Sequence, residues 1–136
     1  MESLQKKRWG GETMEWTIWV AIGAVSGAIA VGFGAFGAHA LRQQLTPENL
    51  AVFETAARYQ MYHALGLIAV GLLGVKVDSL AIRIAGSAFT VGTVLFSGSL
   101  YTLVLTNMRA LGVITPFGGL GFICGWLALA FAALKP

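Results

Sequence analysis

Nine polar side chains stand out in a chain that is otherwise mostly apolar, because their types could bind ions, move protons or attack a substrate. This candidate polar cluster consists of His39, Arg42, Glu54, Arg58, Tyr59, His63, Ser97, Ser99 and Tyr101. The two histidines could ligate a metal or haem, or relay protons within a membrane. Neither has a histidine four residues away or a carboxylate partner, so the sequence predicts no metal site and no cofactor. A role in proton transfer stays open.

The serines of the segment FSGSLY, residues 96–101, could in principle serve as nucleophiles. A catalytic serine needs a neighbouring base and an oxyanion hole, and the chain has no G-x-S-x-G turn to present one. Hydroxyls in apolar helices more often bond to a neighbouring helix. We therefore expect Ser97 and Ser99 to join helices, and the chain not to be an enzyme.

The polar residues before the second apolar run fall on different faces of one helix. Glu54 and Arg58 are four residues apart, so they can pair along one face. At 100° per residue, His63 lies about 180° from Glu54 and shares its face with Tyr59 and Gly66. Because glycine and histidine both suit a helix contact, we expect His63 to face the interior.

Composition points to lipid as the main solvent of the elements that carry these residues. The chain has 136 residues, of which 57% are hydrophobic and 11% charged, and its mean hydropathy is +0.75. A soluble domain carries about 25% charged residues. The net charge of +3 is small, and basic residues do not alternate with aromatic ones, which excludes a nucleic-acid surface. The single cysteine, Cys124, excludes an internal disulfide and is expected to pack within its apolar segment.

Four apolar segments predict an all-α, integral membrane four-helix transmembrane bundle with antiparallel neighbours and short loops. Thr46 and Pro47 signal the start of the second helix, and Thr115 is the expected cap of the fourth. The expected spans are about 16–38, 61–75, 84–105 and 116–134, with an amphipathic helix start over 47–60. Residues 16–135 then form a single domain.

The first span ends at Ala38-His39-Ala40, which could also be the cleavage site of a signal peptide. A signal peptide has an apolar core of about 7–15 residues, whereas this core has 20 or more. We therefore expect the first helix to be retained.

Small residues recur every three or four positions in the first and fourth spans. Such spacing places them on one face, where a neighbouring helix can approach closely. The predicted packing glycines are Gly23, Gly27, Gly34 and Gly37 in the first span, and Gly118, Gly121 and Gly125 in the fourth. Gly86, Thr90, Thr93 and Ser97 continue the pattern in the third. A compact bundle with little interior volume follows.

The distribution of basic residues predicts that both termini are cytoplasmic. With four spans, one side holds Lys6, Lys7, Arg8, Lys76, Arg83 and Lys135, and the other holds Arg42, Arg58 and Arg109. Residues 1–15 are expected to be a basic tail that is disordered or not native. Either Met1 or Met14 could be the native start, because Glu15 and Trp16 lead directly into the span.

Four blocks of sequence in this order, GAFGAHAL, ETAARYQMYHAL, GTVLFSGSLY and TPFGGLGFICGW, resemble domain-of-unknown-function family 423. The resemblance covers about residues 17–134. It implies a small four-span bacterial membrane protein with a retained first helix and an inner-membrane location, and mitochondria contain similar proteins. It implies no activity and no catalytic residue. The 13 residues before Met14 depart from the family, whose members usually begin close to the first helix.

Two hypotheses for function remain at this point. The first is a non-enzymatic component of the inner (plasma) membrane that packs with the bilayer and a larger membrane complex, or with copies of itself as a homo-oligomer. The second is a small proton-coupled transporter or ion-conducting protein that uses the polar cluster at the non-cytoplasmic end.

Overall fold

The computed structural model describes the backbone of residues 2–135 and the side chains of residues 16–135, and these residues form helices and turns with no strand among them. The helices are α1 (Glu2–Phe36), α2 (Pro47–Gly74), α3 (Leu80–Thr93), α4 (Ser99–Thr106) and α5 (Thr115–Leu134). The π turn η1 (Gly37–Leu41) continues α1, and the π turn η2 (Val94–Gly98) joins α3 to α4. A 3-10 turn, η3 (Arg109–Val113), precedes α5.

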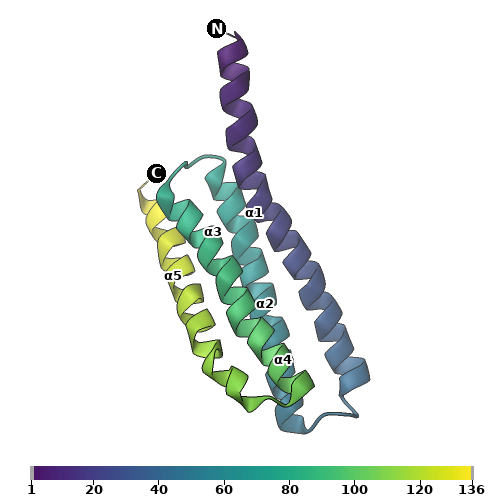
Figure 1. The fold of residues 1–136 in the computed structure, drawn as a ribbon. Helices are drawn as coiled ribbons and strands as arrows, with labels where there is room; N and C mark the ends of the chain where they lie inside the picture. The colour runs from purple at the N-terminus through teal and green to yellow at the C-terminus, as the bar shows by residue number, and fades with distance from the viewer. Residues whose placement is uncertain (1, 136) are drawn as a thin grey trace.

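The helix α1 extends past the expected first span and protrudes beyond the other helices (Figure 1). It starts at Glu2, where the sequence predicts a disordered tail over residues 1–15. Gly10 and Gly11 weaken a helix without forbidding it, which accounts for this difference. The choice between Met1 and Met14 as native start stays a prediction, and Met1 lies outside the described residues.

Capping explains where the middle helices start. Thr46 accepts a hydrogen bond from the backbone N–H of Asn49 at 3.2 Å, and Pro47 occupies the first turn of α2 as predicted. Ser79 caps α3 in the same way through Ile82. The expected cap of α5 is wrong, because Thr115 lies inside the helix and its hydroxyl bonds to another helix instead.

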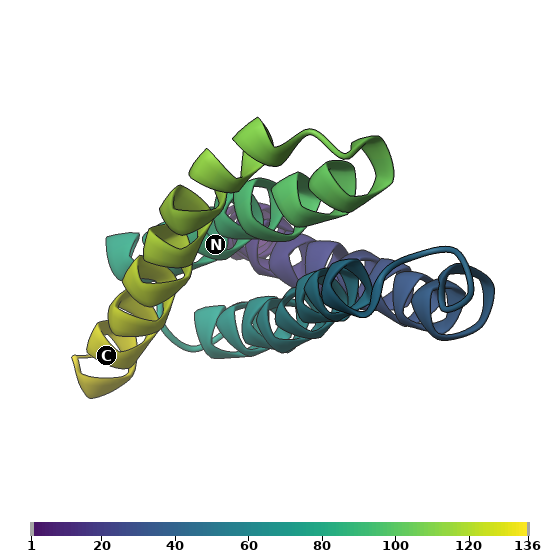
Figure 2. The same ribbon diagram turned by 90° about the horizontal axis from the view of Figure 1, so that it is seen from below.

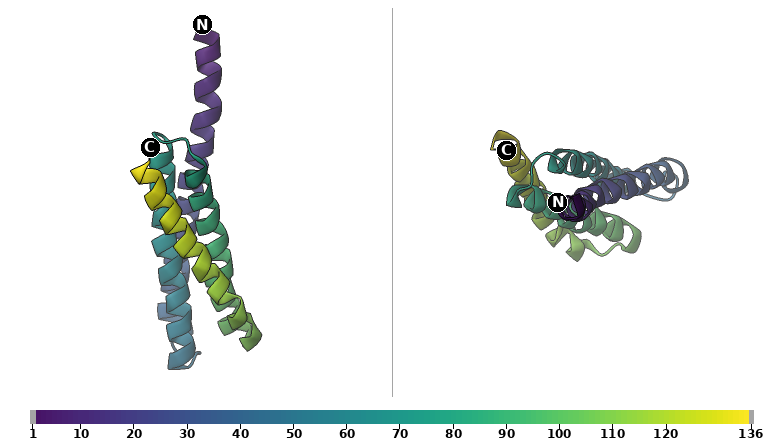
Figure 3. Two further views of the ribbon diagram at one scale, coloured as in Figure 1. Left: turned by 90° about the vertical axis from the view of Figure 1, so that its left-hand side faces the viewer. Right: turned by 90° about the horizontal axis from the view of Figure 1, so that it is seen from above.

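The helices form two hairpins that meet along α2 and α3. The helix α1 packs along α2. In the rod made by α3, η2 and α4, the parts α3 and η2 pack along α5, while α2 contacts α3, η2 and α4. Figures 1 and 3 show the chain descending through α1, returning through α2, descending through α3 and returning through α5. Seen from below, α1 and α5 lie at opposite flanks of the α2–α3 pair (Figure 2).

Within the described residues, three helical stretches are long and apolar enough to cross a bilayer: Trp16–Leu41, Leu80–Thr106 and Arg109–Leu134. The apolar part of α2 is too short to meet this criterion. Many large apolar side chains also face outward, among them Leu72 and Val94, which are 62% and 66% exposed. Exposure of this extent suits a lipid-facing surface.

Close helix contacts depend on glycine. A Cβ atom built at Gly23 would lie 2.7 Å from the carbonyl oxygen of Ala64, so α1 and α2 could not approach as they do. Gly37 meets Phe53 in the same interface. The predicted packing glycines of α5 also touch α3 and η2: Gly118 and Gly125 at least as closely as Gly23 touches α2, and Gly121 less closely, with a Cβ atom 3.2 Å from the Cα of Gly92.

Gly34 differs from the prediction that it mediates helix packing, and Gly27 faces α2 at an ordinary contact distance without a close approach of the backbones. A Cβ atom at Gly27 would come no nearer than 3.8 Å to its neighbours, and at Gly34 it would meet nothing within 4 Å. Gly86, part of the small-residue pattern predicted in the third span, lies against Trp19, and α2 adds an unpredicted contact, because Gly74 lies against Trp16. Cys124, expected to pack inside, is exposed on the outer side of α5.

Candidate functional site

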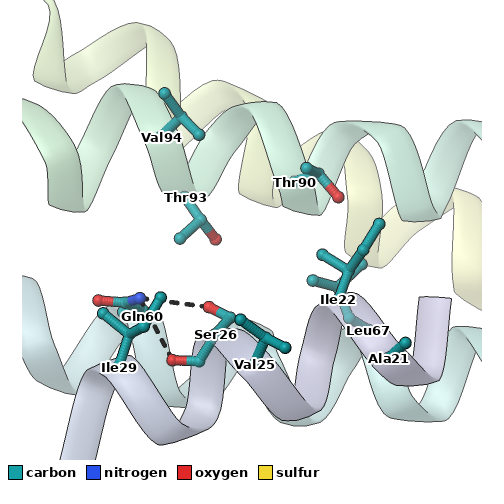
Figure 4. A pocket seen from close by; sticks show the side chains of 10 residues that line it. All are labelled: Ala21, Ile22, Val25, Ser26, Ile29, Gln60, Leu67, Thr90, Thr93 and Val94. Carbon is teal, nitrogen blue, oxygen red and sulfur yellow. Dashed lines mark hydrogen bonds between the residues drawn. The ribbon is translucent and has the colours of Figure 1, made fainter. Parts of the chain in front are cut away.

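The buried polar side chains gather around the first half of α2, and Gln60 connects three helices. The Tyr101 hydroxyl of α4 donates a hydrogen bond of 2.8 Å to Gln60 Oε1. Gln60 Nε2 in turn donates to the backbone oxygen and the hydroxyl of Ser26 in α1, at 3.2 and 3.3 Å. Figure 4 shows the two bonds to Ser26. Both the oxygen and the nitrogen of the Gln60 amide are therefore hydrogen-bonded, as expected for a buried amide.

Both serines of the FSGSLY segment bond to another helix. Ser97 is fully buried, and its hydroxyl donates to the carbonyl oxygen of Ala56 in α2 at 2.8 Å. The Ser99 hydroxyl lies 2.7 Å from that of Thr115 in α5 and also donates to the Phe96 carbonyl at 2.9 Å. These hydroxyls hold the rod of α3, η2 and α4 to both of its neighbours, in keeping with the expected packing role.

His63 is buried in the interior, with 4% of its surface exposed, as its helix face predicts. Nε2 lies 3.1 Å from the indole N–H of Trp126, which can only donate, so Nε2 accepts and carries no proton. Nδ1 then holds the proton and donates to the Tyr59 carbonyl oxygen at 2.6 Å. The ring lies face to face with Phe122 at 3.4 Å between centroids. Both nitrogens of this neutral imidazole are engaged.

The candidate polar cluster divides into an interior part and a surface part. His39, Arg42, Glu54 and Arg58 are exposed, while His63, Ser97, Ser99 and Tyr101 are buried. Tyr59 is 38% exposed and has its ring against Phe96. Long charged side chains stay at the surface because burying an unpaired charge is costly.

No ion pair joins Glu54 to Arg58, although both are described residues; the ion pair at the α2–α3 loop joins Arg83 to Asp78 at 3.6 Å. The described residues also contain no group of three histidine, cysteine or acidic side chains that could hold a metal ion.

Three residues of these buried hydrogen bonds were not among the site residues predicted from the sequence: Ser26, Gln60 and Trp126. Ser26 and Trp126 supply the partners of Gln60 and His63, and Gln60 itself does not belong to the candidate polar cluster. The signal available for Gln60 was a polar amide at the edge of an apolar run. The hydroxyl of Thr90, a member of the small-residue pattern of the third span, donates to the carbonyl oxygen of Gly86 within α3 at 2.8 Å.

Two grooves that open to the surface flank the contact between α2 and α3. The groove between α1 and α3 measures about 420 Å³, and Figure 4 shows the side chains that line it. The Thr93 hydroxyl oxygen is buried there without a hydrogen-bond partner. The groove between α2 and α5 measures about 800 Å³ and has His63 and Trp126 in its lining.

Comparison with known proteins finds a matching family model and similar membrane proteins. The family model described as "Protein of unknown function (DUF423)" matches residues 33–119. A UPF0382 membrane protein of Staphylococcus epidermidis is 48% identical over 118 residues, which are 87% of this chain and 96% of the relative. The UPF0382 membrane protein YwdK of Bacillus subtilis is 44% identical over 119 residues, with 87% and 97% covered. No solved structure matches the chain.

Proposed function

Because the chain belongs to the DUF423 family, whose members similar to it are named as membrane proteins of unknown function, we propose that it is a four-span packing subunit of the plasma membrane. In this proposal it joins a larger membrane assembly, acts without catalysis and needs no cofactor. The parts of the proposal rest on different features of the chain.

The fourth span is α2. Its 28 residues make a helix of about 42 Å, which exceeds the roughly 30 Å of a bilayer core. It lies between α1 and α3, so its polar residues Gln60 and His63 are covered by other helices and need not meet lipid. A helix in this central position requires fewer apolar residues than one facing lipid on all sides. Neighbouring spans are then antiparallel.

The positive-inside rule supports a cytoplasmic location for both termini. In this orientation Lys76, Arg83 and Lys135 face the cytoplasm together with the basic residues of the N-terminal segment. Arg42 and Arg58 face the other side.

The observation that carries the packing role is the open flank of α1. This helix is held by α2, while an outer face of small residues remains exposed: Ala24, Ala28, Gly32 and Ala35. Nothing lies within 4 Å of a Cβ atom built at Gly32. Beside this face, the groove towards α3 contains the unpartnered hydroxyl of Thr93. A helix of another subunit could pack on the small residues and supply a polar side chain to Thr93.

The hydrogen bonds that occupy the polar side chains of the interior favour a packing role over proton-coupled transport. A proton relay needs groups that can exchange protons with water or with one another. His63 has both nitrogens bonded to Tyr59 and Trp126, and Gln60 is occupied by Tyr101 and Ser26. The grooves beside them are lined mainly by apolar side chains.

The packing role is tested by affinity purification from native membranes after mild cross-linking. Tagged wild-type protein should retain a stoichiometric membrane partner, either another protein or an untagged copy of itself. Gly32→Leu adds bulk to the open face of α1 and should abolish this association, and Thr93→Val should weaken it. The matched control is Gly119→Leu, which adds the same bulk on α5 where space is also available. Equal recovery of the partner with Gly32→Leu and Gly119→Leu would refute the assignment of this face.

A further inference from the structure

We propose that the groove between α2 and α5 binds a phospholipid, with one acyl chain in the groove and the phosphate at Arg58. The groove is lined by aromatic rings from both helices, including Tyr59 and Tyr62 of α2 and Phe122 and Trp126 of α5. These rings present an apolar surface that an acyl chain can cover. The volume of about 800 Å³ lies along the outside of the helix pair, so a lipid can enter from the bilayer.

The direction and length of the groove match one leaflet. On α5 its lining runs from Pro116 to Trp126, which corresponds to about 15 Å of helix. Half of a bilayer core is also about 15 Å thick. Pro116 lies in the first turn of α5 and Tyr59 just before the apolar run of α2, so this end of the groove lies at the membrane boundary. The other end reaches Trp126, about midway along the helix.

A cation, Arg58, lies beside the boundary end of the groove, and two tyrosines of α2, Tyr59 and Tyr62, line the groove next to it. Arg58 precedes Tyr62 by four residues, so it lies on the same face of α2, one turn nearer the membrane surface. It is exposed and forms no ion pair with any described residue; the nearest acid along α2 is Glu54, one further turn outward. The hydroxyls of Tyr59 and Tyr62 have no hydrogen-bond partner in the described part of the chain. A phosphate can accept bonds from all three groups.

The lining favours a lipid over a transmembrane helix. Helices associate through small residues that let backbones approach. Here the lining is bulky, and Gly119 is the one glycine in it. A flexible acyl chain can fit between irregularly placed rings, whereas a rigid helix would be held away from both backbones. The phosphate of a lipid also arrives at the boundary end, where Arg58 lies.

Native mass spectrometry of the purified full-length chain in detergent tests this site. We expect the wild type to bind phosphatidylglycerol at one site with at least tenfold higher affinity than diacylglycerol, which lacks the phosphate. Inorganic phosphate alone should not bind, which distinguishes a lipid from a free anion. Arg58→Gln should reduce phosphatidylglycerol affinity to the level of diacylglycerol.

Filling the groove should remove both lipids. A Cβ atom at Gly119 would meet only Phe96, at 4.0 Å, so Gly119→Leu should enter the groove without disturbing the fold. Leu120→Trp, at an exposed position of the lining, serves as the second variant, and circular dichroism confirms that both are folded. Gly32→Leu is the control on α1 and should bind as wild type.

Equal lipid binding by the wild type and both groove variants would overturn the proposal, as would diacylglycerol or inorganic phosphate binding as tightly as phosphatidylglycerol. The outcome is independent of the packing role, because that role is tested by Gly32→Leu and this one by Gly119→Leu.

Discussion

The indole N–H of Trp126 donates a hydrogen bond of 3.1 Å to Nε2 of His63, which joins α5 to α2. This bond fixes the imidazole as the neutral tautomer and aligns its ring against Phe122. The helices α2 and α5 otherwise touch little, since α5 packs mainly on α3. Among the described residues, this hydrogen bond is the one that links the flanking helix α5 to the central helix α2.

Replacing Trp126 with Phe should destabilise the protein by about 1–3 kcal/mol, because the buried Nε2 of His63 loses its donor. Unfolding in mixed micelles, followed by circular dichroism, measures this change. In a double-mutant cycle with His63→Phe, the two changes should couple. Additive effects would show that the bond contributes nothing to stability.

Tyr101→Phe should cost about 1 kcal/mol, because it leaves Gln60 Oε1 without its donor while keeping the aromatic ring. The matched control is Thr102→Val, which removes an exposed hydroxyl bonded within its own helix to Gly98. The same unfolding measurement compares the two. If the control lowers the free energy of unfolding as much as Tyr101→Phe, the buried hydrogen bond between Tyr101 and Gln60 contributes no more to stability than an exposed one.

Glycine substitutions should separate tight from loose helix contacts. Gly125→Ala places a methyl group 2.5 Å from the ring of Phe89 and should destabilise by about 1–3 kcal/mol. Gly27→Ala has room for the methyl group and should be neutral or stabilise by up to about 1 kcal/mol, because alanine favours helix. The melting temperature in detergent distinguishes them. A stable Gly125→Ala variant would mean that α3 and α5 lie further apart.

The four-span topology predicts a pattern of cysteine labelling in a Cys124→Ser background. A membrane-impermeant maleimide added to intact cells should label Gln43→Cys and Met108→Cys, which lie in loops at the non-cytoplasmic end. Asp78→Cys should react only after the cells are opened. Labelling of Gln43→Cys and Asp78→Cys from the same side would show that α2 does not cross.

Removing the Thr93 hydroxyl should affect association more than folding. Thr93→Val keeps the shape and removes a buried hydroxyl that has no partner within the described residues, so the isolated chain should be as stable as wild type or more so. Thermal unfolding of the purified chain measures this. A loss above about 1 kcal/mol would indicate that the hydroxyl has a partner inside the chain.

Local signals in the sequence predicted local features well. Thr46 and Pro47 mark the start of α2, and helical geometry places His63 inside, because both depend on neighbours along one helix. Thr115 shows the limit of this reasoning. Its type and the following proline fit a cap, but Ser99 of another helix offers its hydroxyl a partner, which only the proximity of the first residues of α4 and α5 reveals.

Relationships between helices could not be read from one sequence. The pairing of Gln60 with Ser26 and Tyr101 requires knowing how three helices are rotated about their axes. The same holds for the glycines, since Gly23 and Gly27 lie on one face of α1 yet only Gly23 meets a close neighbour. The open flank of α1 was likewise beyond prediction, because periodicity does not state which faces remain uncovered.

The π turn η2 separates two parts of the rod of α3, η2 and α4 that pack against different neighbouring helices. A π turn holds one residue more than an α turn, which offsets the face of everything after it by about 100° from that of an unbroken α-helix. Before it, α3 lies between α5 and α2; after it, α4 no longer packs along α5, lies against α2 and directs Tyr101 to Gln60. Deleting one residue between Val94 and Gly98 should therefore rotate the phenol of Tyr101 away from the Gln60 amide and loosen the packing of α4 on α2. The contact between α3 and α5 should stay intact.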